Sequence, residues 1–152
     1  MTHEEWRKRM ESISIAQASD TSVALKMVFV LAEEVQDETS ASLSRWHEEQ
    51  TLQSAIRIYL DMNRKEDACA LLEELASRQR KVLVGAGHAA AQLLAEAALI
   101  RFQLGEGEAG VRLVKEALQL FGHFPEPNSF LNDAIGEWRR FVADRGIAGS
   151  HS

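Results

Sequence analysis

Apolar residues recur along the chain at the 3.6-residue spacing of amphipathic α-helices. One such stripe consists of Ala24, Met27, Val28, Leu31 and Val35. Applied to the whole chain, the spacing predicts seven helices, over residues 2–16, 21–36, 40–62, 64–82, 88–104, 107–121 and 128–145. The two prolines, Pro125 and Pro127, fall between the last two helices, and Gly105 follows the fifth, where glycine commonly ends a helix. We therefore predict an all-α fold.

The second, fourth and sixth predicted helices align with one another. A small residue in each is followed, four and seven positions later, by further apolar or small residues. The aligned sets are Ala24, Ala68 and Gly110; Val28, Leu72 and Val114; and Leu31, Leu75 and Ala117. The small residues, at positions 24, 68 and 110, are separated by 44 and 42 residues. Small residues let paired helices approach closely, and stacked pairs share one core.

This alignment predicts a tetratricopeptide-like α-solenoid of antiparallel helix pairs in a single domain, residues 1–152. The helix pairs cover residues 2–36, 40–82 and 88–122, and a capping helix at 126–145 and a tail at 146–152 follow. A non-repeating helical bundle with coincidental spacing is the alternative.

Two motifs resemble known helical repeats. Leu104-Gly105, followed by Ala117-Leu118, resembles the tetratricopeptide pattern. Residues 55–75 and 93–120, followed by Phe121-Gly122-His123-Phe124 and Ser129–Asp133, resemble the sensor repeats of bacterial MalT-like regulators in the LuxR family. This resemblance covers about residues 52–145 and implies a receiver for an inducer or a regulatory protein. The chain has no Gly-x-x-x-x-Gly-Lys-Ser/Thr loop, and few residues follow the last predicted helix, so we expect the binding scaffold alone.

Charge and composition narrow the class of partner. The net charge is −6, and the basic clusters at residues 7–9 and 78–81 lie beside acidic residues, which disfavours nucleic acid as a partner. No apolar run is long enough to span a membrane, and the charged N-terminus does not resemble a signal peptide. Cys69 is the only cysteine, so no intramolecular disulfide can form. We expect a cytoplasmic protein.

Three features of the sequence bear on a catalytic or cofactor-binding function. Residues 85–90, Gly-Ala-Gly-His-Ala-Ala, match the glycine spacing of a dinucleotide-binding loop, but the sequence after them stays helical, which favours a turn between helices. The five histidines are not at metal-ligand spacing. Cys69 lies on an apolar helix face, where a buried structural thiol is the simpler interpretation. We predict no catalytic residue, no metal site and no cofactor.

The first helix of each stacked pair is expected to line a concave binding surface. The partner-binding candidates on these helices are Trp6, Arg9, Ile13, Gln50, Gln53, Arg57, Gln92, Leu99, Phe102 and Gln103. Arg9 and Arg57 would clamp a carboxylate bidentately. Alternatively, Trp6, Leu99 and Phe102 belong to the core. A second candidate patch consists of Trp138, Arg139 and Arg140, although Trp138 would equally serve to pack the last helix on the sixth.

Two function classes follow from these features. The first is a non-catalytic adaptor or regulatory sensor domain that binds a protein, a peptide or a small-molecule inducer. The second is a small dedicated neutraliser or chaperone, such as a bacterial immunity protein or a secretion chaperone, whose acidic charge would suit a basic partner.

Overall fold

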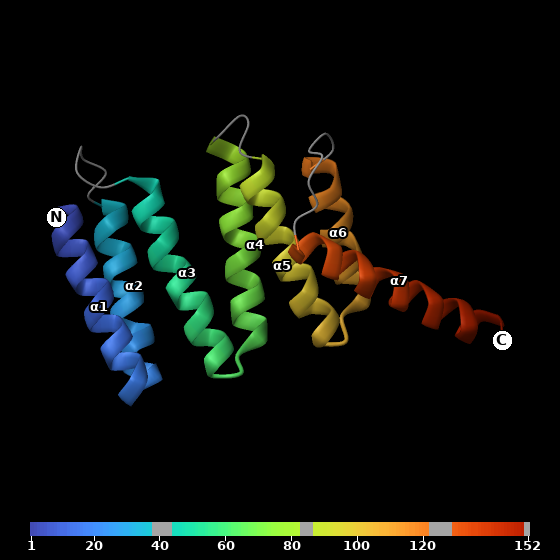
Figure 1. Cartoon of the computed structure of the whole chain (residues 1–152), viewed down its shortest axis with the longest axis horizontal. Helices are drawn as coiled ribbons and strands as arrows, with labels where there is room; N and C mark the ends of the chain where they lie inside the picture. Colours follow the sequence, from blue (N-terminus) through green and yellow to red (C-terminus); the bar gives the residue numbers. More distant parts are fainter. Residues whose placement is uncertain (38–43, 83–86, 122–128, 151–152) are drawn as a thin grey trace. The chain divides into compact units, whose positions relative to one another are not determined.

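The computed structural model describes residues 1–37, 44–82, 87–121 and 129–150. All regular structure in these ranges is helical, which confirms the predicted all-α fold (Figure 1). The seven helices are α1 (His3–Ser19), α2 (Thr21–Asp37), α3 (Arg45–Asp61), α4 (Lys65–Val82), α5 (Gly87–Gln103), α6 (Gly107–Phe121) and α7 (Ser129–Ser150).

Two of the predicted helix boundaries need comment, the start of the third helix and the end of the seventh. The predicted start of the third helix at residue 40 lies outside the described residues, and α3 is described from Arg45. α7 continues to Ser150, beyond the predicted end at residue 145. No proline occurs in 146–150, and the two glycines there, Gly146 and Gly149, each weaken a helix by only about 1 kcal/mol relative to alanine, so nothing there forces the helix to end.

Polar side chains fix the start of the first two helices. The Thr2 hydroxyl accepts a hydrogen bond from the backbone N–H of Glu5 at 3.1 Å. The Asp20 carboxylate accepts from the N–H groups of Ser22 at 3.0 Å and Val23 at 3.3 Å. Each bond satisfies N–H groups that have no partner inside the helix. Asp20 is therefore the capping residue of α2.

The α3–α4 and α5–α6 turns have the same geometry. Asn63 and Gly105 both adopt positive φ, at 57° and 78°. The next residue in each turn, Arg64 or Glu106, donates its N–H to the carbonyl five positions earlier, at 2.7 and 2.9 Å. This is the hydrogen bond of a Schellman motif, for which glycine and asparagine are the favoured residues. Asn63 and Gly105 lie 42 residues apart, which equals the spacing of the aligned residues Ala68 and Gly110.

The aligned positions of the even-numbered helices are all buried. They are Ala24, Val28, Leu31, Ala68, Leu72, Leu75, Gly110, Val114 and Ala117. The alignment therefore identified core residues correctly. The helix-pair packing is consistent with a helical repeat, and stacking of the pairs into a solenoid stays a prediction.

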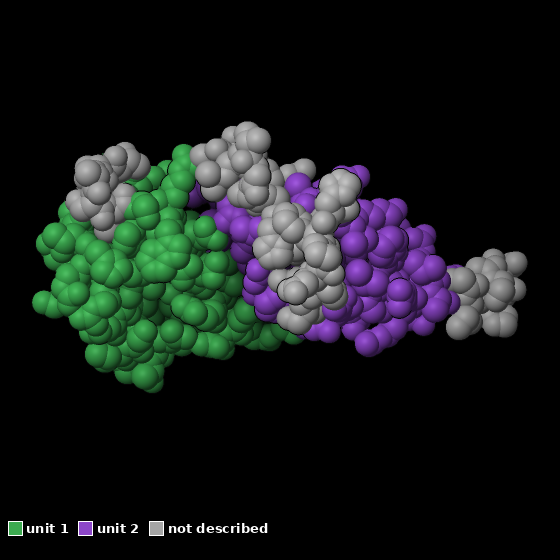
Figure 2. Space-filling model, turned by 45° about the horizontal axis from the view of Figure 1, so that its top comes forward, with its two compact units in different colours: residues 1–68 green, residues 69–152 purple. Residues whose placement is uncertain are grey.

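The chain divides into two compact units, Met1–Ala68 and Cys69–Ser152, with the boundary inside α4 (Figure 2). In the first unit α2 packs against both α1 and α3. α1 and α3 also run parallel to each other, because His3 contacts His47 near their starts and Gln17 contacts Asp61 near their ends. The core side chains of this unit include Trp6, Ile13, Val28, Leu31, Leu52 and Ile58.

In the second unit α5 is the central helix. It packs against α6 and α7, and the Cys69 thiol of α4 donates a hydrogen bond to its Ala97 carbonyl at 3.3 Å. Alanines are buried on several sides of α5, at positions 90, 91, 95, 97 and 98. Such small side chains allow several helices to approach the same helix closely.

Candidate functional site

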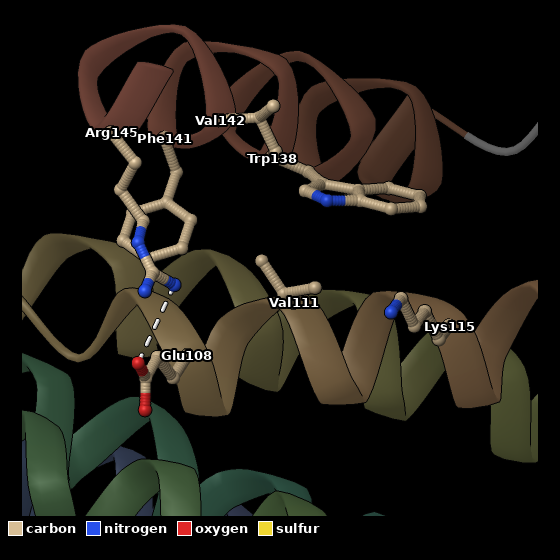
Figure 3. A pocket seen from close by; sticks show the side chains of 7 residues that line it. All are labelled: Glu108, Val111, Lys115, Trp138, Phe141, Val142 and Arg145. Carbon is tan, nitrogen blue, oxygen red and sulfur yellow. Dashed lines mark ion pairs between the residues drawn. The ribbon is translucent and has the colours of Figure 1, made fainter. Parts of the chain in front are cut away.

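Two adjoining hollows lie between α6 and α7 in the second unit. The first has a volume of about 520 Å³ and is lined by Glu108, Val111, Lys115, Trp138, Phe141, Val142 and Arg145 (Figure 3). The second, of about 590 Å³, is lined by Leu118, Ile135, Trp138, Arg139, Val142 and Ala143. Trp138 and Val142 line both hollows, so we treat them as one surface and call it the α6–α7 groove.

The position of α7 on α6 creates the groove. α7 runs back along α6, because Trp138 lies over Lys115 whereas Arg145 pairs with Glu108, one to two turns earlier on α6 (Figure 3). The Phe141 ring rests on Gly107, where a Cβ atom would overlap it. The missing side chain at Gly107 therefore lets α7 approach the start of α6.

The floor of the α6–α7 groove is apolar and open to solvent. Trp138 is half-buried, and Val142 is 54% exposed. These two residues are four positions apart on α7, so they lie on the same helix face. Ile135 and Leu118 continue the apolar surface into the second hollow. Trp138 thus packs beside α6 and also presents its indole to the groove. Its position is therefore compatible with both roles considered from the sequence, in a surface patch and in packing the last helix on the sixth.

Positive charge flanks this floor. The Lys115 ammonium lies 5.9 Å from the centre of the Trp138 ring, within range of a cation–π interaction. The Arg145 guanidinium lies 5.3 Å from the centre of the Phe141 ring and 3.4 Å from the Glu108 carboxylate. Arg139 lines the second hollow and is exposed. The described lining of the groove therefore carries three cations and one carboxylate.

The predicted binding residues of the first unit differ in burial and in their partners. Trp6 and Ile13 are buried in the core, and the Trp6 indole N–H donates to the Thr51 hydroxyl at 2.9 Å. Arg9 pairs with Glu34 of α2, whereas Arg57 is exposed and donates to the Ser54 hydroxyl of its own helix at 2.9 Å.

Gln50 and Gln53 of α3 are half-buried, and Gln53 donates to Glu49, one turn earlier, at 3.5 Å. In this unit, then, the structure engages Arg9 and Arg57 with different partners and does not bring them together on one carboxylate.

The predicted binding residues of α5 also differ in exposure. Gln92 and Leu99 are half-buried, and Gln103 is exposed. Phe102 is half-buried, and the centre of its ring lies 6.3 Å from that of the Phe141 ring of α7. The Phe102 ring also lies against Gly110, where a Cβ atom would come within 2.9 Å of it. Phe102 therefore helps to hold α7 in place at one end of the α6–α7 groove.

A histidine pair at the start of α3 was not expected from the sequence. His3 Nδ1 and His47 Nε2 lie 2.9 Å apart, and the backbone N–H of Ser44 donates to His47 Nδ1 at 3.0 Å. Because Nδ1 of His47 accepts this bond, its neutral ring carries the proton on Nε2 and donates it toward His3. Burial, assisted by the charge of the nearby His3, lowers the pKa of His47.

The rings of Trp6 and Trp46 surround this pair, with their centres 4.9 and 5.2 Å from that of His47. The neutral His47 ring thus serves as part of the cap of α3, and the two tryptophans shield it.

The single cysteine is held in a polar cluster between helices of the second unit. Burial raises the pKa of the Cys69 thiol to about 12; the Arg101 charge opposes this effect and Glu73 adds to it. Arg101 donates to the Glu73 carboxylate of α4 and to Glu106 at the start of α6, each at 2.8 Å. A thiol that stays protonated is a poor nucleophile, so this cluster is suited to linking helices rather than to covalent catalysis.

The described residues on both sides of the glycine-rich segment are helical, and none of them forms a strand. α4 ends at Val82 and α5 begins at Gly87, and residues 83–86 lie outside the described residues. A dinucleotide-binding loop requires a strand directly before its first glycine.

The described residues show neither a cluster of metal ligands nor a membrane-spanning helix. Within them, no three His, Cys, Asp or Glu side chains come together as the ligands of a metal ion would. None of the described helices combines the length and the apolar character needed to cross a membrane.

No protein-family model matches this chain, and no curated protein matches it either. The resemblances to tetratricopeptide repeats and to MalT-like sensor repeats therefore stay predictions.

Proposed function

We propose that this chain is a non-catalytic helical domain that binds a protein or peptide partner, as an adaptor or a sensor. The observation that carries the proposal is the α6–α7 groove, where a half-buried tryptophan and an exposed valine form an open apolar floor beside three cations. Tryptophan and arginine are the residues most enriched among energetic hot spots of protein interfaces.

The chemistry of the described residues supports binding more than catalysis. The Cys69 thiol is fully buried and its pKa is raised to about 12. The neighbouring Arg101 already bonds to two carboxylates of its own unit. Among the described residues that line the α6–α7 groove there is no histidine or cysteine, and the one carboxylate, that of Glu108, pairs with Arg145.

The proposal is tested by selecting peptides from a random displayed library on the full chain and measuring their affinity by fluorescence anisotropy. Trp138→Ala should weaken the selected peptides by roughly 30-fold or more, as expected for an aromatic hot spot. Trp46→Ala is the matched control, because Trp46 is also an accessible tryptophan, 52% exposed, but lies on α3 in the other unit. Trp138→Phe, which keeps the apolar ring, should lose less than Trp138→Ala.

Peptide binding that is equal in the wild type and in Trp138→Ala would contradict the proposal, as would the absence of any enriched peptide. A small-molecule panel that raises the melting temperature of the wild type but not of Trp138→Ala would instead assign the groove to an inducer.

A further inference from the structure

The charges around the α6–α7 groove contrast with those of the chain as a whole. The chain has 17 Lys and Arg residues against 23 Asp and Glu, a net charge of −6. The described residues that line the two hollows reverse this balance, with Lys115, Arg139 and Arg145 against one carboxylate, Glu108. A local excess of cations on an acidic protein selects for an anionic partner and repels a cationic one.

The cations of the groove are also available to a ligand. Among the described residues, Lys115 and Arg139 form no ion pair, and both side chains are exposed. Arg145 lies over the Phe141 ring and forms a long, exposed ion pair with Glu108, at 3.4 Å and with the two side chains 63% and 80% exposed. Exposed pairs of this kind contribute at most about 1 kcal/mol, so an incoming carboxylate can compete for Arg145.

The apolar floor lies between these charges. Trp138 and Val142 occupy successive turns of one face of α7, and the indole ring has Lys115 on its α6 side (Figure 3). A large apolar side chain placed on this floor would bring the residues before and after it within reach of the flanking cations. Apolar anchors that fill a groove between helices, with charges at its rim, are a common mode of peptide recognition.

We infer that the α6–α7 groove binds an acidic peptide segment of a partner protein, with a large apolar side chain on Trp138 and Val142 and carboxylates on Lys115, Arg139 and Arg145. This inference rests on the proposed function and adds the chemistry of the partner. It differs from the expectation that an acidic chain of this kind neutralises a basic partner, because the charges at the groove have the opposite sign.

The inference is tested with a displayed peptide library whose central position is Leu, Ile, Phe or Trp and whose flanking positions are drawn equally from Glu, Gln and Lys. On the wild-type chain, selection should enrich Glu and deplete Lys. In the double variant Lys115→Glu, Arg139→Glu the preference should reverse toward Lys. Arg140→Glu is the control, since Arg140 is an exposed cation of α7 that pairs with Glu137 and lines neither hollow.

Affinities of the enriched acidic peptides provide the second measurement. Lys115→Gln and Arg139→Gln should each weaken binding about two- to fivefold, the range expected for one exposed ion pair, and Arg140→Gln should not. The effect of each variant should shrink as the salt concentration rises, because salt screens exposed charges.

The possible results distinguish a failure of this inference from a failure of the proposed function. Peptides that bind through Trp138 without regard to flanking charge would overturn the inference and leave the proposed function standing. If no peptide binds in a manner that depends on Trp138, both fail. Sedimentation that shows a dimer of the wild type and a monomer of Val142→Glu would assign the groove to a second copy of the chain, which also overturns the inference.

Discussion

Replacing Arg101 with alanine should destabilise the second unit more than the loss of any exposed ion pair. The Arg101 guanidinium donates to Glu73 and to Glu106, each at 2.8 Å, and so joins α4, α5 and the start of α6. Its side chain is only 18% exposed, whereas the carboxylates are 35% and 36% exposed. Arg101→Ala would leave both carboxylates without this partner and facing each other.

The size of the effect follows from burial. A hydrogen bond to a charged group contributes about 1.5–3 kcal/mol, and an exposed ion pair contributes less than about 1 kcal/mol. Because water still reaches about a third of each carboxylate, we take roughly 1–1.5 kcal/mol for each bond, or about 2–3 kcal/mol for both. In a chain of this length 1 kcal/mol shifts the melting temperature by about 2–4 °C, so the expected loss is roughly 4–12 °C.

The assay is thermal and urea unfolding followed by far-UV circular dichroism. Arg140→Ala provides the comparison, because Arg140 pairs with Glu137 at 3.0 Å but is 75% exposed. It should lose less than about 1 kcal/mol. If Arg101→Ala loses no more than Arg140→Ala, the Arg101 bonds do not stabilise the packing of these helices and the argument from burial is refuted.

Three further predictions concern the thiol, the histidine pair and the close approach of α7. Cys69 should resist thiol reagents in the native state and react on unfolding, because burial raises its pKa to about 12; rapid native labelling would contradict this. The pKa of His47 is lowered, so its stabilising contribution is present above the ordinary value of 6.5 and is lost as pH falls below it. His47→Gln should therefore flatten the fall of the melting temperature in that range, and an unchanged pH profile would exclude the role of His47. Gly107→Ala should cost about 1–3 kcal/mol by overpacking the Phe141 ring, and adding Phe141→Leu should recover much of it; equal denaturation midpoints for both variants would argue against the contact.

The even-numbered helices were the most predictable part of the fold. Their apolar residues form single stripes, so the aligned positions such as Val28, Leu72 and Val114 could be assigned to the core from spacing alone, and all three are buried. The turn residues Asn63 and Gly105 could be aligned for a related reason, since few residues other than glycine and asparagine adopt positive φ.

The packing of α5 was harder to predict. Apolar and small side chains lie on several of its faces, and alanines at positions 91, 95 and 98 are all buried. When apolar positions extend around a helix, their pattern does not indicate which face packs against which neighbouring helix. For this reason the sequence does not indicate whether Leu99 and Phe102 belong to the core or to the binding surface. Both are half-buried in the structure.

Contacts between distant segments explain what the sequence could not predict about the candidate sites. His3 and His47 meet because α1 and α3 lie parallel, a fact that no local spacing records. Residue type alone predicts a patch of Trp138, Arg139 and Arg140, of which Arg140 does not line the groove. Lys115 and Arg145 become part of this surface only because α7 runs back along α6.

The first helices of the pairs were expected to bind, yet many of their candidate side chains already have partners within their own unit. Trp6 bonds to Thr51, Arg9 pairs with Glu34, and Phe102 packs on Phe141. A side chain held by such contacts must break them before it can serve a partner, which lowers the affinity it can contribute. Trp138 needs no such rearrangement, since its indole already lines the open groove and the Lys115 beside it remains exposed. For this reason we propose the binding surface on α6 and α7. Peptide affinities of Arg57→Ala measured beside those of Trp138→Ala would show how far the first helices share in it.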